Sequence, residues 1–188
     1  MTSSRISRRL LLGGAGAALL APSLLMAEQN PRPPVNRHNI MGFSLHHWQD
    51  HFDSIGKASI VADTASRALH FWGGDGKTYK VYPTSVPRTD DLTRRGYTTI
   101  VRKRIGPDWT PTPSMMEANP DLKYMPPGPH NPLGTHAMYL DWPSYLIHGT
   151  HDPRKIGRQS SSGCIGLYNN MIAQLFAMAP VGTQVRII

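Results

Sequence analysis

The stretch of residues 106–134 limits what this chain can fold into, because it carries eight prolines between Pro107 and Pro132. Proline has no backbone N–H and clashes with the preceding helical turn, so regular helix and central strand are disfavoured over most of this stretch. A long irregular connection inside a compact domain is usually functional or disordered. This one contains Trp109 and several methionines, which favours a structured loop beside an active site over a floppy surface excursion.

Short strands are predicted on both sides of this loop. Asp75 and Gly76 form an Asp-Gly pair of the kind that joins the two strands of a hairpin. A helix with an apolar stripe is predicted over 170–178, with Asn169 as its N-cap. The strand candidates are 58–64, 68–72, 78–86, 97–103, 145–150 and 184–188.

The first 27 residues predict an export signal. A basic start is followed by an uncharged stretch diluted with glycine and alanine, and the adjacent Arg8 and Arg9 resemble a twin-arginine signal. The alternative is an uncleaved N-terminal anchor. Export of this type places the protein in the periplasm.

A polar, proline-containing linker follows the signal over 28–39, and residues 43–52 have helix-compatible spacing. The remaining length suits one domain with a proper core. The predicted organisation is therefore a signal (1–27), a linker with a short helix (28–56) and a catalytic domain (57–188).

Charge and histidine spacing exclude some functions. Residues 1–27 carry three arginines and no acid, so the rest has 17 Lys and Arg against 12 Asp and Glu. That modest positive charge is spread along the chain and suits an anionic polymer such as a bacterial wall, and no nucleic-acid motif is present. His47 and His51 share a face at i,i+4, but no third ligand follows at a recognisable spacing, so we predict no metal.

The single cysteine, Cys164, cannot form an intramolecular disulfide, so it is either buried or a nucleophile. His148 ends an apolar run sixteen residues earlier and is placed to act as its base, lowering the pKa of the thiol. The backbone carbonyl of Gly149 could orient the imidazole, and the N–H groups near Gly163 and Cys164 could bind an oxyanion. Ser162 is small and leaves the thiol accessible. Residue chemistry alone leaves a Cys–His acyl-transfer enzyme and a buried free cysteine both open.

The run I-H-G-T-H-D-P-R-K-I-G-R-Q-S-S-S-G-C-I-G and the closing P-V-G-T-Q-V resemble the catalytic core of the YkuD-type L,D-transpeptidases. The upstream M-P-P-G-P-H-N-P-L-G segment is similar to a further family motif. The resemblance covers residues 58–188 and is most specific in the last sixty. It implies a mainly β sandwich of mixed β-sheets with a few short helices.

The resemblance assigns Cys164 as the nucleophile, His148 as the base and Gly149 as the residue whose carbonyl orients the imidazole. It implies that the substrate is a peptidoglycan peptide stem, joined to a neighbouring stem in a 3→3 cross-link or to a wall-attached protein. No cofactor is needed. Substrate-binding roles are expected for Ser162, Gly163, His136 and Tyr139, the last two on a strand expected to border the cleft.

Two departures from the family pattern affect the expected activity. Gly166 stands where the family usually has an arginine, and Lys155 or Arg158 could replace that cation in space. Ser162 stands where many members have histidine. The alternatives to transpeptidation are therefore a hydrolytic relative, either an L,D-carboxypeptidase or an amidase, and a non-catalytic wall-binding module.

Overall fold

The structure, a computed structural model, describes residues 44–188. The export signal expected over 1–27 and the linker expected over 28–39 lie outside the described residues. Within residues 44–188, every helix is too short or too polar to cross a membrane.

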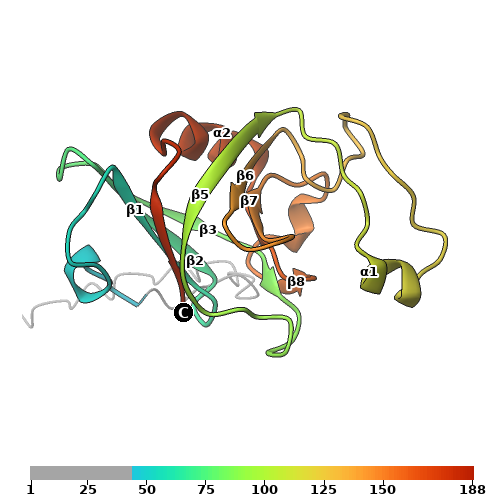
Figure 1. The fold of residues 1–188 in the computed structure, drawn as a ribbon, viewed down its shortest axis with the longest axis horizontal. Helices are drawn as coiled ribbons and strands as arrows, with labels where there is room; N and C mark the ends of the chain where they lie inside the picture. Colours follow the sequence, from blue (N-terminus) through green and yellow to red (C-terminus); the bar gives the residue numbers. More distant parts are fainter. Residues whose placement is uncertain (1–43) are drawn as a thin grey trace, which may run out of the picture. The chain divides into compact units, whose positions relative to one another are not determined.

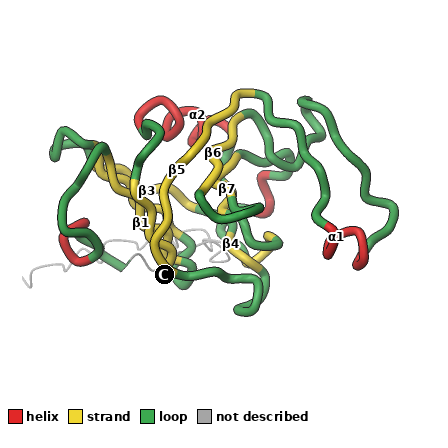
Figure 2. Tube along the Cα trace, in the orientation of Figure 1, coloured by secondary structure: helices red, strands yellow, loops and turns green. Residues whose placement is uncertain are grey.

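The main sheet of the described residues has eight strands in the order β3-β2-β1-β10-β5-β6-β7-β9 (Figures 1 and 2). β10 runs parallel to β1, β9 runs parallel to β7, and the other neighbours are antiparallel. The strands are β1 (Ala58–Asp63), β2 (Ala68–Gly73), β3 (Tyr79–Pro83), β5 (Gly96–Ile105), β6 (His136–Leu140), β7 (Leu146–His148), β9 (Ile165–Gly166) and β10 (Gln184–Ile187).

A second, small sheet pairs β4 (Val86–Pro87) with β8 (Gln159–Ser161). The helices are short: α1 (Pro113–Ala118), α2 (Asn169–Met178) and the 3-10 turns η2 (Trp48–Asp50) and η3 (Pro153–Lys155). The predicted fold class, mainly β with mixed sheets and a few short helices, is confirmed.

The hairpin expected at the Asp-Gly pair lies between β2 and β3. Asp75 Oδ1 accepts hydrogen bonds from the backbone N–H groups of Lys77 and Thr78, at 3.0 and 2.9 Å. Gly76 has φ +66°, a backbone conformation that glycine adopts without steric cost. The turn therefore follows from local sequence alone.

Helix α2 covers one face of the sheet (Figure 1), and the predicted apolar stripe faces the core. Ile172, Leu175 and Ala179 are fully buried and Phe176 is partly buried. Lys103, on β5, donates from Nζ to the carbonyls of Phe176 and Ala179, where a cation stabilises the negative end of the helix dipole.

The start of α2 differs from the prediction. Tyr168 is the N-cap residue, without a side-chain hydrogen bond, and Asn169 is the first helical residue. The Asn169 side chain is not available as a cap because it bonds to two loops beside the active site, as described below.

Residues 106–134, the proline-rich arm, connect β5 to β6 and extend beyond the β6–β7 part of the sheet (Figure 1). Trp109 and Met125 exchange two backbone hydrogen bonds of 2.9 Å. The buried Asn131 donates from Nδ2 to three carbonyls of the arm, at 3.0–3.1 Å, and accepts from Leu133 N at 2.9 Å. These bonds make the arm a structured loop.

The proline content predicts no helix over most of the arm, but the structure has the short helix α1 there. Pro113 occupies the first turn, where its missing N–H costs nothing. Thr112 caps the helix, with its side chain accepting from Met115 N at 3.3 Å. The general rule about proline therefore fails for these six residues.

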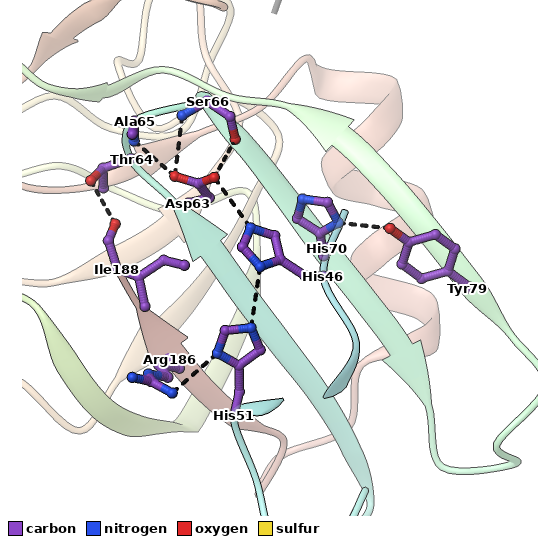
Figure 3. Close-up of polar contacts among 10 residues, drawn as sticks. All are labelled: His46, His51, Asp63, Thr64, Ala65, Ser66, His70, Tyr79, Arg186 and Ile188. Atoms are coloured by element: carbon purple, nitrogen blue, oxygen red, sulfur yellow. Dashed lines mark hydrogen bonds and ion pairs between the residues drawn. The ribbon is translucent and has the colours of Figure 1, made fainter. Parts of the chain in front are cut away.

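The segment of residues 44–56 packs against β1 and β10 through histidines (Figure 3). Where a short helix was expected, the structure has the single turn η2, with no buried residue. His51 contacts His46 at 3.3 Å instead of forming a pair with His47. The i,i+4 spacing of His47 and His51 therefore does not bring their side chains together.

Candidate active site

Cys164 directly precedes β9, which runs beside β7 in parallel register, with Ile147 beside Ile165 and His148 beside Gly166. Side chains alternate between the faces of a sheet, and aligned residues share a face. Cys164 and His148 therefore project from the same face of neighbouring strands. Both line one cleft of about 780 Å³.

The His148 ring is held by the residue that follows it. Its Nδ1 lies 2.5 Å from the carbonyl oxygen of Gly149. A carbonyl only accepts, so Nδ1 carries the proton and Nε2 keeps its lone pair. Within residues 44–188, Nε2 has no protein hydrogen-bond partner. The predicted orienting role of the Gly149 carbonyl fits this geometry.

Burial, opposed by the Gly149 hydrogen bond and aided by the nearby Lys155 charge, lowers the pKa of His148 to about 4. The imidazole is therefore neutral at pH 7. A neutral imidazole with an unbonded Nε2 can accept a proton from a neighbouring thiol.

The Cys164 thiol is half-buried and lies 3.4 Å from the carbonyl oxygen of Ser144. Burial raises the pKa of Cys164 to about 11, with a small opposing effect from a backbone hydrogen bond of Leu146. This differs from the expectation that the imidazole lowers the thiol pKa. The imidazole is uncharged, so it offers no cation to stabilise a thiolate, and the resting pair is thiol and neutral imidazole.

The turn before Cys164 is fixed by its own hydrogen bonds. Ser161 Oγ donates to the carbonyl oxygen of Cys164 at 2.6 Å and accepts from Gly163 N at 3.3 Å. Gly163 has φ +136°, and a Cβ there would lie 3.5 Å from the Tyr145 ring. Of the two predicted oxyanion donors, Gly163 N–H is partly engaged, which leaves the Cys164 N–H.

Asn169 joins the two loops that border His148. Its Oδ1 accepts from the backbone N–H groups of Thr150 and Thr135, at 3.1 and 3.2 Å. A Cβ at Gly149 or Gly134 would lie 2.3 or 2.2 Å from this oxygen, so both positions need glycine. Asn169 therefore holds the segment that carries the Gly149 carbonyl. Sequence reasoning missed this role because it assigned the side chain to the helix cap.

His136 and Tyr139 lie on opposite faces of β6. Tyr139 aligns with Leu146, on the face of Cys164, but Arg102 stacks 3.5 Å above its ring and it does not line the cleft. His136 projects to the α2 side, where its ring centroid is 4.9 Å from that of Phe176. The structure does not bring either side chain to the thiol, and their substrate-binding roles stay predictions.

The proline-rich arm forms the outer wall of the cleft, as predicted for a loop flanking the site. It contributes Trp109, Met115, Leu122, Met125 and His130. His151 also lines the cleft. The arm supplies most of the large apolar residues of the cleft, and the turn that precedes Cys164 supplies serines.

Gly166 faces Ser85, from the segment that precedes β4. The two residues exchange backbone hydrogen bonds of 2.8 and 3.1 Å, and a Cβ at position 166 would lie 2.3 Å from Ser85 Oγ. Of the two cations considered as replacements for an arginine here, Lys155 lines the cleft and Arg158 does not. Arg88, which sequence reasoning missed, lines it too.

The comparisons with known proteins agree with this geometry. The YkuD family model, described as the L,D-transpeptidase catalytic domain, matches residues 57–187. A Fuscovulum blasticum protein named as an L,D-transpeptidase in the ATP synthase subunits region is 62% identical over 178 residues, covering 95% of this chain and 93% of that protein. Escherichia coli ErfK/SrfK, named as an L,D-transpeptidase, is 38% identical over 144 residues, covering 72% of this chain and 45% of that protein.

Two solved structures show the same fold at low sequence identity. An L,D-transpeptidase from Mycobacterium smegmatis has a TM-score of 0.55 and 20% identity, covering 70% of this chain and 58% of that one. An LD transpeptidase solved in complex with imipenem has a TM-score of 0.54 and 16% identity, covering 70% of this chain and 59% of that one. The chain thus spans less than two thirds of these two proteins and less than half of ErfK/SrfK.

Proposed function

Because the chain belongs to the L,D-transpeptidase family, we propose that it forms 3→3 cross-links between peptidoglycan peptide stems through a cysteine acyl-enzyme. The observation that carries this proposal is the placement of Cys164 and His148 on one face of β7 and β9, in one cleft, with Nε2 of the imidazole unbonded.

In the first half-reaction, Cys164 attacks the carbonyl carbon of the third residue of the donor stem, and His148 Nε2 takes the thiol proton as the C–S bond forms. The Cys164 backbone N–H stabilises the oxyanion in this proposal. The tetrahedral intermediate then collapses. His148 returns the proton to the leaving nitrogen, and the terminal D-alanine departs with a free amine.

In the second half-reaction, the side-chain amine of a neighbouring stem attacks the thioester carbonyl. His148 takes a proton from this amine, the C–S bond breaks, and the proton returns to the sulfur. The net result is one peptide bond broken and one formed, with D-alanine released and no cofactor consumed. A wall-attached protein that offers an amine would react by the same steps.

The two pKa values support transfer of the thiol proton to His148 as Cys164 attacks, rather than a thiolate that exists before the substrate binds. The thiol, with a pKa of about 11, and the imidazole, with a pKa of about 4, are both neutral at pH 7. Such a pair resembles a serine–histidine pair, in which the base acts as the nucleophile attacks.

The test is mass spectrometry of the products formed from a disaccharide-tetrapeptide by the mature protein. We expect a dimer that lacks one D-alanine, and its absence in the Cys164→Ala variant. Tripeptide without dimer would show that water is the acceptor and would make the protein a hydrolase. Unchanged substrate would contradict both enzyme assignments and favour a non-catalytic wall-binding module.

A second test measures the thiol itself. One structural neighbour was solved in complex with imipenem. We expect imipenem to add its mass once to the wild-type chain and not to Cys164→Ala, which has no other cysteine. A wild-type chain that stays unmodified would argue against an acylating thiol.

We also propose that the protein is exported to the periplasm, on the basis of the Arg8-Arg9 pair and the uncharged stretch that follows. Cell fractionation of the full chain tests this. Replacing both arginines with lysine should retain the protein in the cytoplasm, whereas unchanged export would contradict the twin-arginine assignment.

A further inference from the structure

The cleft around Cys164 has an unbalanced charge. Arg88 and Lys155 are among its lining residues, and no aspartate or glutamate of the described chain lines it. The nearest acids along the sequence are paired elsewhere: Asp90 with Arg95 at 2.7 Å, and Asp152 with Arg154 at 2.8 Å. Asp152 also interacts with Lys155, whose charge helps to lower the pKa of that carboxyl. Among the described residues that line the cleft, however, the two cations have no acidic partner.

Arg88 is fixed next to the nucleophile. Its backbone N–H donates to Ser161 O at 3.0 Å, and its Nη2 donates to Ser162 Oγ at 2.9 Å. Ser162 is two positions before Cys164. The guanidinium has five N–H donors in a rigid fork, so a single bond to a hydroxyl leaves donors for a planar oxyanion such as a carboxylate.

Lys155 lines the same cleft, close enough to His148 for its charge to lower the pKa of the imidazole. It ends η3, its carbonyl accepts from Ser160 Oγ at 3.1 Å, and its side chain is half-buried in the cleft wall. Its positive charge helps to lower the pKa of both His148 and His151. Both cations therefore line the cleft of the reacting pair, Arg88 from the residue after β4 and Lys155 from η3.

The packing around Gly166 explains why a cation comes from the residue that follows β4. Ser85 Oγ occupies the space that a side chain at position 166 would need, at 2.3 Å from an added Cβ. The segment that brings Ser85 against Gly166 also carries Arg88, three positions later. The segment of residues 85–88 thus fills the space beside Gly166 with Ser85 and places the positive charge of Arg88 in the lining of the cleft.

We propose that Arg88 and Lys155 form a carboxylate subsite beside Cys164, which holds a carboxylate of the peptide that acylates the cysteine. The identity of the ligand as a peptide rests on the proposed function, whereas the preference for a carboxylate rests on the charges of the cleft. Arg88 supplies the directional contact with its fork of donors, and Lys155 adds a second positive charge.

The first experiment needs no turnover. Cys164 is the only cysteine, so intact mass follows its alkylation by iodoacetate, an anion, and by iodoacetamide, its neutral analogue. In both reactions the sulfur displaces iodide from the same carbon. We expect the iodoacetate-to-iodoacetamide rate ratio to fall about fivefold in Arg88→Gln and in Lys155→Gln, and further in the double variant.

Lys80→Gln is the matched control, because it removes one positive charge from β3, outside the cleft. We expect its rate ratio to equal that of the wild type. Added salt should lower the wild-type ratio toward that of the double variant. A ratio that is the same in the wild type and the double variant would overturn the subsite.

The second experiment uses the donor peptide. For the wild type, converting the carboxylates of a stem tetrapeptide to amides one at a time should lower kcat/KM about tenfold at one position. The Arg88→Gln/Lys155→Gln double variant should show no such loss. If the variant discriminates as strongly as the wild type does, the carboxylate assignment is wrong.

The two experiments separate failure of the subsite from failure of the proposed function. Suppose that the wild type does not react with the stem peptide, but its iodoacetate-to-iodoacetamide rate ratio falls in the variants. This result would contradict transpeptidation and support the anion site. Normal cross-linking with an unchanged ratio supports transpeptidation and overturns the site. Protection of Cys164 by inorganic phosphate but not by the stem would identify a phosphate site and overturn the carboxylate assignment.

Discussion

His148, on β7, and His46, which contacts Asp63 of β1, are both partly buried histidines, but their ring nitrogens are used differently. His148 engages only Nδ1, with the Gly149 carbonyl, and keeps Nε2 unbonded within the described residues. His46 engages both nitrogens: Nε2 lies 3.2 Å from Asp63 Oδ2, and Nδ1 lies 3.3 Å from His51 Nε2 (Figure 3).

The series of hydrogen bonds continues from His51 to Arg186. The Nδ1 of His51 lies 3.1 Å from Arg186 Nη1, and because Arg186 only donates, Nδ1 must accept. His51 Nε2 therefore donates to His46 Nδ1, and His46 Nε2 donates to Asp63. Both ring nitrogens of His46 and both of His51 therefore have a hydrogen-bond partner. A group of histidines can thus be purely structural. An unbonded nitrogen indicates a base only where it opens into a cleft beside a nucleophile, because the buried His70 also has an Nε2 that is unbonded within residues 44–188.

Replacing the two histidines should give opposite results. His148→Gln should lower kcat/KM for cross-linking by about 10³-fold or more, because the proton acceptor is lost. His46→Gln should leave kcat/KM within about twofold of the wild type and lower Tm, because only the docking of residues 44–56 is weakened. Steady-state kinetics and thermal unfolding of both variants check this, and a large activity loss in His46→Gln would contradict the comparison.

Asn169 tests whether the His148 region depends on its supporting hydrogen bonds. Asn169→Ala should lower kcat by about 10-fold to 100-fold and shift the pH profile, because Thr150 N and Thr135 N lose their acceptor at a cost of about 1–3 kcal/mol each. Asn169→Asp keeps the acceptor oxygen and should retain most activity. If Asn169→Ala changes only Tm and leaves the pH profile unchanged, the residue does not position the base.

Acid should destabilise both regions. His148 and the buried His70, which lies beside His46, have pKa values lowered from 6.5 to about 4, chiefly by burial. A depressed histidine pKa means that the unfolded chain binds more protons than the folded one between pH 6.5 and 4. Stability is therefore full above pH 6.5 and falls as the pH drops, by about 1.4 kcal/mol per pH unit for each group.

Urea unfolding at pH 7 and pH 5 measures this loss. His70→Gln and His148→Gln should each reduce the pH dependence, since each removes one group that must stay neutral. Tyr79 OH lies 2.7 Å from His70 Nδ1, so His70→Gln also lowers stability at pH 7. A pH dependence that is the same in both variants as in the wild type would contradict the assignment.

The last expected effect, of a size similar to the acid effect, concerns Gly166. Gly166→Ala should cost about 1–3 kcal/mol, because the new methyl group meets Ser85 Oγ. In the Ser85→Ala/Gly166→Ala double variant the nearest Ser85 atom is Cβ, at 3.7 Å, so stability should recover. Chemical denaturation of the single and double variants checks this, and an equal loss in both would point to a backbone effect at position 166.

Local patterns in the sequence predicted the local parts of the structure. The Asp75 turn and the buried stripe of α2 follow from residues close together in the chain. The sequence also indicates which face of β6 each residue occupies. His136 and Tyr139 are three positions apart on one strand, so a period of two places them on opposite faces, and expecting both at the cleft was inconsistent.

Contacts between distant segments could not be predicted in this way. Arg88 reaches Ser162 across 74 positions, and the Asn169 side chain bonds to Thr135 across 34. The pairing of β4 with β8 and the start of α2 bring these residues together. The resemblance to a family predicts Cys164 and His148 as the reacting pair and offers Lys155 as a candidate cation, whereas Arg88 enters the cleft only through the packing of this particular chain.

The position of β10 has a consequence for synthesis. This strand, residues 184–187, lies between β1 and β5, so the two parts of the sheet are joined only through it. During translation, β1 to β3 emerge more than a hundred residues before their parallel neighbour and keep an unpaired strand edge until it arrives. Long-range parallel pairing is slow to form, and open edges invite aggregation. A ribosome that stalls before residue 184 would therefore release a chain with an incomplete sheet, and a chaperone that covers the β1 edge would be most useful during that interval.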